Sequence, residues 1–355
     1  MASRRVLFVT NGHGEVAIAA RIAAEVHRLA EVATDHLALV GADFAEGELV
    51  MVGPRRSMPS GGLVAMGNLG AFARDVLAGF IPFWLEGVRY VRRARGRYAC
   101  VVSVGDVYCL WMALGARTRT IFVGTAKSAY VAPYGPLECR IMRRAQRVFV
   151  RDSATQRIVR DCGVAAEAPG NVITDLAQSE QRFPWQGDPR IVVLPGSRAS
   201  AYANAATIGA ALRVMATRRS IDVAVSIAPG IEEQRLLDAL GVTARSWDGP
   251  LGALFCGATL ALGQAGTANE AAAAAGVPVV ALADGARKED WYRMRQRKLL
   301  DGALAIVPSD AQLAAHEILA LIDDPARRGE MAACGHERMG DPGGAVAIAR
   351  AILAA

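Results

Sequence analysis

The chain has 355 residues, of which 52% are hydrophobic and 21% are charged. This composition excludes an intrinsically disordered protein, and the length is sufficient for two cores of ordinary domain size. The formal net charge is +6, with arginine-rich stretches at 89–97 and 140–147. A basic surface can meet nucleic acid, anionic lipid or a phosphorylated substrate. No RNA- or DNA-binding motif accompanies either stretch, so we expect no nucleic-acid partner.

Strands and helices are predicted to alternate along the first half, as in a parallel sheet. We expect strands near 5–10, 36–41, 100–105, 120–124 and 147–151, and helices over 15–31 and 135–147. A further helix begins after Arg151, with Asp152 or Ser153 as its N-cap, and ends at Gly163. The N-terminal residues lead directly into a short strand and not into a signal-peptide hydrophobic region, which favours a cytoplasmic protein.

The segment from 63 to 97 combines large aromatic residues with arginines. Gly79 and Pro82 interrupt its apolar positions, so it is too broken for a membrane span, which needs about 20 continuous apolar residues. Periodicity leaves two interpretations open: a buried helix pair on the first sheet, or a helix or helical hairpin in the headgroup region of an anionic membrane. The candidate acceptor or membrane residues are Phe80, Phe83, Trp84, Arg92 and Arg93.

The second half repeats the alternation after an irregular stretch at 168–189, where we place the domain boundary. Strands are expected near 190–194, 221–227, 258–262, 277–282 and 304–307, followed by helices near 310–322 and 325–334. Both halves open with a strand, a glycine loop and an alanine-rich helix. This predicts two doubly wound α/β domains, 1–175 and 176–340, with a ligand cleft between them. The final helix, within 341–355, is expected to pack back on the first domain.

The six cysteines form no CxxC pair and have no histidine at metal-ligand spacing. This favours reduced, mostly buried thiols and argues against a structural zinc site.

Two loops of the second half have the composition of phosphate-binding turns. In Pro195-Gly196-Ser197-Arg198, glycine permits close approach of a ligand, serine and the following amides can donate, and arginine offers a charged fork. Gly266 and Thr267 begin an alanine-rich helix, where free amides and the helix dipole favour an anion. The alternative for this second loop is an ordinary strand-to-helix turn with Thr267 as the helix cap.

Titratable residues follow two strands of the first half. His13 and Glu15 lie in the sequence NGHGE, which lacks the third glycine and the distant acidic residue of a dinucleotide fingerprint. Because a histidine between two glycines is a poor core residue, His13 is a candidate catalytic group. Asp106 ends an inner strand and can act as a general base or orient a histidine. Its alternative role is to cap the next helix.

Together these motifs resemble the lipid-A-disaccharide synthase group of glycosyltransferases. The resemblance rests on NGHGE, the GD at 105–106, the GN at 170–171, LPGSR and AGTANEAAAAAGVPVV, and it is narrower with related proteins that have an NGHGE-type first loop. It implies the GT-B fold, with two Rossmann-like domains. It also implies a UDP-sugar donor, a lipid acceptor, peripheral attachment to the inner face of the membrane, and an inverting transfer that needs neither metal nor other cofactor.

Matched position by position, the resemblance assigns Gly196, Ser197, Arg198, Gly266 and Thr267 to the donor, and Glu270 is a further candidate donor residue. It matches Asp106 to the first acid of the family's GIDAPDF segment and places Glu15 near the aspartate of its SGD loop. Three family acids are replaced, by Cys109, Ala201 and Ala271. Glu270 lies one residue before the expected ribose-binding glutamate, rotated by about 100° around the helix. The chain is therefore expected to be a relative of the synthase and not the synthase itself.

We expect a hexosyltransferase in which His13 or Asp106 takes the proton of a lipid hydroxyl. Helix N-termini at Ser197 and at Gly266, with Arg198, would stabilise the departing diphosphate. Two alternatives remain. A UDP-sugar 2-epimerase of similar two-lobed fold would need several carboxylates around the sugar and no lipid acceptor. A non-catalytic lipid- or nucleotide-binding protein would be consistent with the missing acids.

Overall fold

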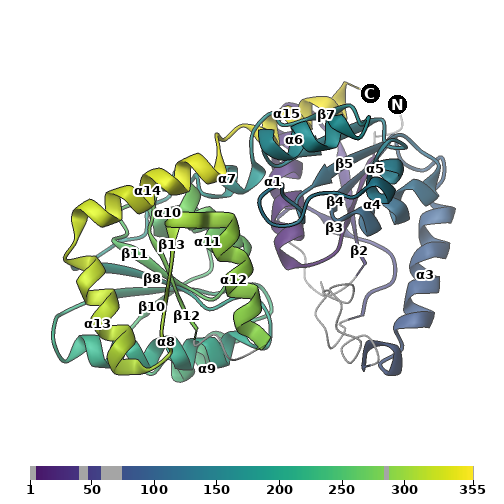
Figure 1. Ribbon diagram of the computed structural model, residues 1–355. Coiled ribbons are helices and arrows are strands. Elements are labelled where there is room, and N and C mark those ends of the chain that lie inside the picture. The colour runs from purple at the N-terminus through teal and green to yellow at the C-terminus, as the bar shows by residue number, and fades with distance from the viewer. Residues whose placement is uncertain (1–4, 40–46, 57–73, 284–287, 355) are drawn as a thin grey trace. The chain divides into compact units, whose positions relative to one another are not determined.

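The computed structural model describes residues 5–39, 47–56, 74–283 and 288–354, apart from the side chains of 288–291 (Figure 1). The chain forms two compact units. The N-terminal unit comprises Met1–Val172 and Pro342–Ala355, and the C-terminal unit comprises Ile173–Asp341. Each unit is built around one parallel sheet with helices packed against it (Figure 1).

The described part of the N-terminal unit holds a seven-stranded sheet in the order β3-β2-β1-β4-β5-β6-β7. Its strands are β1 (Arg5–Thr10), β2 (Ala33–Ala38), β3 (Val50–Met51), β4 (Cys100–Gly105), β5 (Thr120–Gly124), β6 (Arg147–Val150) and β7 (Ala166–Glu167). Their interior residues are buried on both sides, as the continuous apolar runs require. Because β1 pairs with β2 on one side and with β4 on the other, the strand order reverses between β1 and β4.

Two helices of the N-terminal unit begin at an aspartate side-chain cap, Asp106 and Asp152. The helices of this unit are α1 (His13–Leu29), α3 (Phe80–Arg93), α4 (Val107–Ala113), the 3₁₀ turn η1 (Leu114–Ala116), α5 (Pro136–Met142), α6 (Ser153–Asp161) and α15 (Gly344–Leu353). Asp152 caps α6 by accepting from Thr155 N at 2.6 Å, one of the two predicted caps. The terminal helix α15 packs on α1, and Arg119 donates to the carbonyl of Ala351 at 2.8 Å.

The C-terminal unit repeats the same topology, with the sheet order β10-β9-β8-β11-β12-β13 among its described residues. The strands are β8 (Arg190–Leu194), β9 (Asp222–Ser226), β10 (Arg245–Trp247), β11 (Leu260–Gly263), β12 (Val279–Leu282) and β13 (Leu304–Val307). The helices are α7 (Val172–Leu176, where the chain enters this unit), α8 (Ala201–Ala216), α9 (Glu233–Leu240), α10 (Leu251–Phe255), α11 (Thr267–Ala274), α12 (Lys288–Leu300), α13 (Ala311–Ile322) and α14 (Pro325–Met339), with η2 (Asp301–Ala303) before β13. Here the order reverses between β8 and β11.

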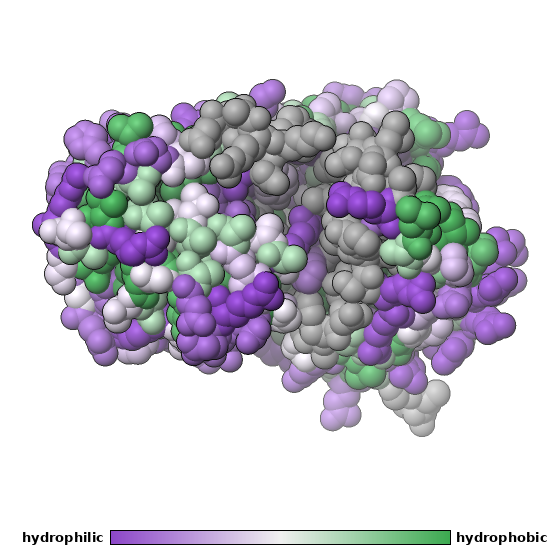
Figure 2. Space-filling view, turned by 90° about the horizontal axis from the view of Figure 1, so that it is seen from below, coloured by the Kyte–Doolittle hydropathy of each residue, from purple (hydrophilic) through white to green (hydrophobic). Residues whose placement is uncertain are grey.

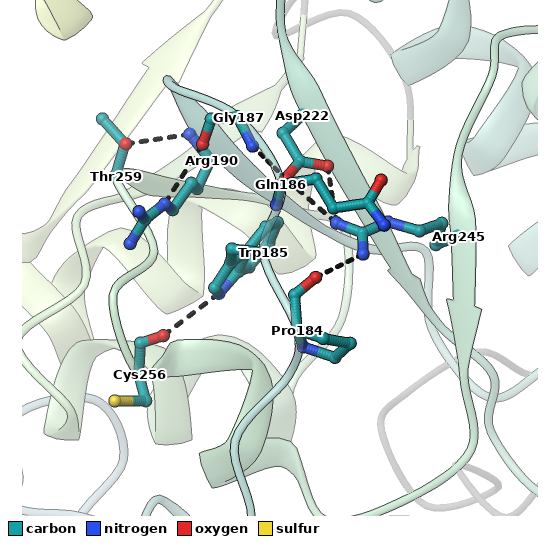
Figure 3. A network of polar contacts seen from close by, with 9 residues as sticks. All are labelled: Pro184, Trp185, Gln186, Gly187, Arg190, Asp222, Arg245, Cys256 and Thr259. Carbon is teal, nitrogen blue, oxygen red and sulfur yellow. Dashed lines mark hydrogen bonds and ion pairs between the residues drawn. The ribbon is translucent and has the colours of Figure 1, made fainter.

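The irregular segment before β8 is fastened to β9 and β10 by the network in Figure 3. Amides of Gln186 and Gly187 donate to Asp222 Oδ2 at 2.6 and 2.9 Å. Arg245 donates to Asp222 Oδ1 at 2.8 Å and to the carbonyl of Pro184. Burial acts to raise the pKa of Asp222, but these hydrogen bonds and the charge of Arg245 outweigh it and hold the pKa below its ordinary value. Asp222 thus links a segment without regular secondary structure to the sheet, and Trp185 adds a hydrogen bond from its Nε1 to the carbonyl of Cys256 at 3.0 Å.

All the strands predicted from the sequence are present, and most begin and end within two residues of their expected bounds. The second strand differs most, since it covers Ala33–Ala38 and not 36–41. Three short strands were not predicted, β3, β7 and β10. Each of them is an edge strand of its sheet. The helix expected over 135–147 ends at Met142.

Candidate functional site

The two sheets each have one topological switch point, where neighbouring loops leave the carboxyl ends of the strands on opposite courses. Ligands of doubly wound sheets bind at such points. In the N-terminal unit the loops follow β1 and β4, and in the C-terminal unit they follow β8 and β11. These are the loops that hold NGHGE, Asp106, LPGSR and AGT. We call this side of each sheet its carboxyl edge.

Glu15 lies across the N-terminal switch point. It belongs to the first turn of α1, and its side chain folds back over Gly12. A Cβ added to Gly12 would lie 2.7 Å from Glu15 Oε2. A Cβ on Gly105, at the end of β4, would lie 3.1 Å from its Cγ. Both glycines have positive φ, 135° and 131°, so each position needs glycine for its backbone as well as for space.

Asp106 fills the capping role that the sequence gave as its alternative, and its second oxygen contacts the neighbouring loop. Its Oδ1 accepts from Cys109 N at 2.9 Å and caps α4. Its Oδ2 accepts from Asn11 Nδ2 at 3.3 Å, which joins the loop after β1 to the loop after β4. Among the described residues, Asn11 Oδ1 is buried without a hydrogen-bond partner. His13 is the first residue of α1 on the same edge and is half-buried.

Cys109 replaces the second acid of the family pattern and lies fully buried behind these carboxylates. Burial, followed by the charges of Asp106 and Glu15, raises the pKa of its thiol well above the ordinary value. The residue is therefore a neutral wall of the site and supplies no second carboxylate.

Sequence reasoning missed a group of residues after β5. Lys127 Nζ lies 2.7 Å from Glu138 Oε2 and 5.8 Å from the ring centroid of Tyr134. A Cβ on Gly124 would lie 2.5 Å from the Tyr134 hydroxyl, so this ring packs over the end of β5. Burial raises the pKa of Tyr134, and the charges of Glu138 and Asp106 raise it further. The available signal was a lysine just after an inner strand.

The first loop of the C-terminal switch point is open where a ligand would approach. Gly196 has φ +107° and no atom within 4 Å of an added Cβ. Arg198 is half-buried, and its Nε is buried without a hydrogen-bond partner among the described residues. The predicted helix N-terminus at Ser197 is wrong: α8 begins at Ala201, because the loop first makes a turn in which Ala201 N donates to Arg198 O at 2.8 Å.

In the second loop, which follows β11, Gly266 and not Thr267 is the N-cap residue of α11. No side chain of the described residues caps this helix. The alternative in which Thr267 caps the helix is therefore wrong. A Cβ on Gly266 would lie 2.3 Å from the Tyr292 hydroxyl, and Gln296 Nε2 donates to the Gly266 carbonyl at 3.0 Å. Glu270 lies in the first turn of α11 with only 9% of its surface exposed.

Arg293 of α12, which was not predicted as a site residue, connects the two C-terminal loops. Its Nε donates to Gln264 Oε1 in the loop after β11. Its terminal nitrogen donates to Asn204 Oδ1 at 3.4 Å, and Asn204 in turn donates to the Pro195 carbonyl at 2.8 Å. A second arginine thus accompanies Arg198 at this switch point.

The proposed acceptor segment is described only from residue 74 onward; 63–73 lie outside the described residues. Phe83 is buried and packs with Phe80, so it supports α3 from inside. Trp84 stacks on Trp111 of α4, with ring centroids 6.4 Å apart. Arg92 and Arg93 are exposed in the last turn. No helix in the described chain is both long enough and apolar enough to cross a membrane.

Metal-ligating side chains do not gather in the described residues, where no group of three or more His, Cys, Asp or Glu could hold an ion. The candidate site is therefore built from arginines, backbone amides and carboxylates.

No protein-family model and no curated protein sequence matches the chain. Solved structures do match over its whole length. The glycosyltransferase SnogD from Streptomyces nogalater covers 99% of both chains at 20% identity and a TM-score of 0.58. UDP-GlcNAc 2-epimerase from Neisseria meningitidis, bound to UDP-GlcNAc, covers 99% of this chain and 98% of its own at 13% identity and a TM-score of 0.53. The chain has the GT-B fold.

A third GT-B structure, MurG from Acinetobacter baumannii, covers 99% of this chain and 100% of its own at 14% identity and a TM-score of 0.54. At such identities the likeness establishes the fold alone, and the chemistry has to be argued from the site. The fold class predicted from the sequence, two Rossmann-like domains of GT-B type, is confirmed.

Proposed function

We propose that the protein transfers a sugar from a UDP-sugar to a hydroxyl of a lipid at the inner membrane surface, with inversion and without a metal. The observation that carries the proposal is the unequal chemistry of the two switch points. The C-terminal one gathers Arg198, Arg293 and the amides of two turns, which suit a diphosphate. The N-terminal one gathers Glu15 and Asp106, which suit a base. The resemblance to the lipid-A-disaccharide synthase group and the fold shared with MurG and SnogD support it.

The transfer would be a single displacement. The acceptor oxygen forms a bond to the anomeric carbon while the bond from that carbon to the diphosphate oxygen breaks, and UDP departs with the electron pair. The acceptor proton passes to His13 or Asp106. Arg198 and the loop amides stabilise the charge that develops on the diphosphate, because fixed donors in a partly buried site cost no reorganisation during the reaction.

The lipid nature of the acceptor is supported by the surface next to α3. Leu77 is 88% exposed, Ile81 44% and Trp111 44%, although large apolar side chains are ordinarily covered. Arginines follow them in the last turn of α3. Apolar and aromatic residues beside cations are the pattern of a surface that lies in an anionic membrane interface.

The donor assignment is tested by titrating the purified chain with UDP in a calorimeter. We expect binding in the wild type and at least about a tenfold weaker affinity in Arg198→Ala. Arg219→Ala is the matched control, since Arg219 makes an exposed ion pair with Asp323 in the same unit. A wild type that does not bind UDP, or an Arg198→Ala variant that binds as well as the control, would refute the assignment.

Transfer itself is tested by incubating the protein with UDP-sugars and membrane lipid extract and following UDP release and labelled lipid together. The proposal expects both signals from one donor, and neither when the extract is omitted. UDP binding without turnover across the panel would indicate a non-catalytic binding protein instead.

One observation favours the 2-epimerase as a second candidate. The carboxyl edge of the N-terminal sheet carries Glu15, Asp106 and Glu138, and such an enzyme needs several carboxylates around its sugar. A UDP-GlcNAc 2-epimerase also shares the fold. Proton NMR of UDP-GlcNAc incubated with the protein alone separates the candidates. A second UDP-sugar formed without acceptor identifies the epimerase, whereas glycosyl transfer leaves the donor unchanged until lipid is added.

A further inference from the structure

A pocket of about 440 Å³ lies in the N-terminal unit between α3, α4 and η1. Four arginines line it: Arg92 and Arg95 from the end of α3, Arg117 after η1, and Arg144 after α5. No aspartate or glutamate is among its lining residues. Four like charges around one cavity repel one another, so the arrangement is stabilised when an anion enters.

These four guanidinium groups are not used elsewhere in the described part of the protein. None of them has an ion pair or a side-chain hydrogen bond there, in contrast to neighbouring Arg119, which donates to the carbonyl of Ala351, and Arg143, which donates to the carbonyl of Cys162. Their donors are therefore available for an external acceptor, and planar guanidinium groups match phosphate oxygens in geometry as well as in charge.

Arg117 has an unusual backbone conformation for a residue with a side chain. Its φ is +50°, in the left-handed region that favours glycine, and it directly follows the 3₁₀ turn η1. A side chain is strained in this region, and strain of this kind gathers at ligand sites. Glycine at position 117 would relieve the strain while removing the guanidinium.

The arginines of the pocket and the candidate base Asp106 lie at opposite ends of the strands of the N-terminal sheet. Arg95, Arg117 and Arg144 precede β4, β5 and β6, so they lie at the amino ends of these strands, whereas Asp106 follows β4 at the carboxyl edge. Asp106 caps the start of α4 and Arg117 follows η1, so the lengths of α4 and η1 separate these two residues by about 15 Å. The pocket is therefore a second site and not part of the first.

The apolar residues that line and adjoin the pocket favour a lipid over a free anion as its ligand. Val91 and Met112 form part of the pocket wall, and Trp111, which also lines it, is 44% exposed. From Trp111 the apolar surface continues along α3 through the half-buried Trp84 to the exposed Leu85 and Ile81. Figure 2 shows hydrophobic side chains gathered beside hydrophilic ones on the side of the N-terminal unit where α3 lies. A phosphate ion would make no use of this surface, but an acyl chain would cover it.

We infer that this pocket binds the phosphate headgroup of an anionic membrane phospholipid, with an acyl chain lying against Trp111 and the exposed face of α3. The inference rests on the membrane attachment in the proposed function and names the lipid group that the surface of Trp111 and α3 would hold. It stands or falls independently of glycosyl transfer, because neither the donor loops nor Asp106 take part in it.

The test measures partitioning of the full chain onto phosphatidylcholine vesicles with and without phosphatidylglycerol. The pocket variant is Arg117→Gly with Arg144→Gln, and the control variant is Arg89→Gln with Arg140→Gln. Arg89 and Arg140 are exposed on α3 and α5 outside the pocket, so both variants lose the same charge. We expect the pocket variant to lose at least about ten times more affinity for the anionic vesicles than the control, which reports general attraction only.

Folding and ligand identity are followed in parallel. Arg117→Gly alone is expected to melt no lower than the wild type and to bind UDP unchanged, which separates this site from the donor site. Inorganic phosphate is expected not to displace the protein from vesicles at constant ionic strength, whereas a soluble short-chain phosphatidylglycerol is expected to displace it. Equal losses in the pocket and control variants, or displacement by phosphate as effective as by the short-chain lipid, would overturn the inference.

Discussion

Asn11 and Asp106 are 95 residues apart in sequence, and their side chains meet across the N-terminal switch point, with Asn11 Nδ2 3.3 Å from Asp106 Oδ2. The other carboxylate oxygen of Asp106 caps α4. One oxygen thus fixes the start of the helix, and the other is held at the carboxyl edge by an amide donor.

Two substitutions of Asp106 separate its charge from its cap. Asp106→Asn keeps an excellent capping side chain, so we expect stability within about 0.5 kcal/mol of the wild type but a loss of activity of at least about 100-fold. Asp106→Ala removes both and should also cost about 1 kcal/mol of unfolding free energy. Activity assays and urea denaturation measure the two effects. If Asp106→Asn remained active, the catalytic role would pass to His13.

Gly105 is predicted to be intolerant of any side chain. Its φ of +131° is strained for other residues, and a Cβ would lie 3.1 Å from Glu15 Cγ and 3.5 Å from Cys109 Sγ. We expect Gly105→Ala to lower the free energy of unfolding by about 1–3 kcal/mol. Gly329→Ala is the control, because that glycine lies inside α14 with no atom within 4 Å of its added Cβ. There alanine should be neutral or stabilising, by up to about 1 kcal/mol. Thermal melting of both variants decides.

Arg293 is predicted to act on UDP affinity by holding two loops together. Lysine has the charge but not the fork that reaches Gln264 and Asn204 at once. We therefore expect Arg293→Lys to weaken UDP binding by about three- to tenfold and Arg293→Ala by more. Lys298→Ala, on the exposed side of the same helix, should bind as the wild type does. Calorimetry that gave Arg293→Lys full affinity would show that only the charge matters.

The inner strands could be predicted from the sequence because each is a continuous apolar run that ends at a turn residue, as β4 does at Gly105. The edge strands β3 and β7 could not be predicted, because two residues are too few to show the hydrophobic pattern of a strand. The same distinction applies to the site. Loops such as 195–198 directly follow a recognisable strand and are visible in the sequence.

Arg293 could not be predicted for a different reason, and neither could the partner of Lys127. Arg293 acts through partners 29 and 89 residues away, and Lys127 acts through a glutamate on the next helix. Their roles depend on which helix the fold brings to the loops, which spacing along the chain does not record. The start of α8 at Ala201 was also missed, because proline, glycine and serine fit a tight turn as well as a helix start.

The stability of the N-terminal unit is predicted to fall below neutral pH because of His36. Burial, with a smaller effect from Arg55, lowers the pKa of His36 from 6.5 to about 4, and Thr10 Oγ1 lies 2.9 Å from its Nε2. Between these two pH values the unfolded chain binds a proton that the folded chain does not, so unfolding becomes more favourable as the pH falls. The full effect is about 3 kcal/mol. Urea denaturation of the wild type from pH 7 to 4, compared with His36→Gln, isolates it. The variant cannot titrate at this position, so the difference between the two free energies of unfolding should shrink by about this amount toward pH 4. A constant difference would show that His36 titrates in the folded protein as it does in the unfolded chain, and a difference that grew toward pH 4 would show that the folded protein holds it charged.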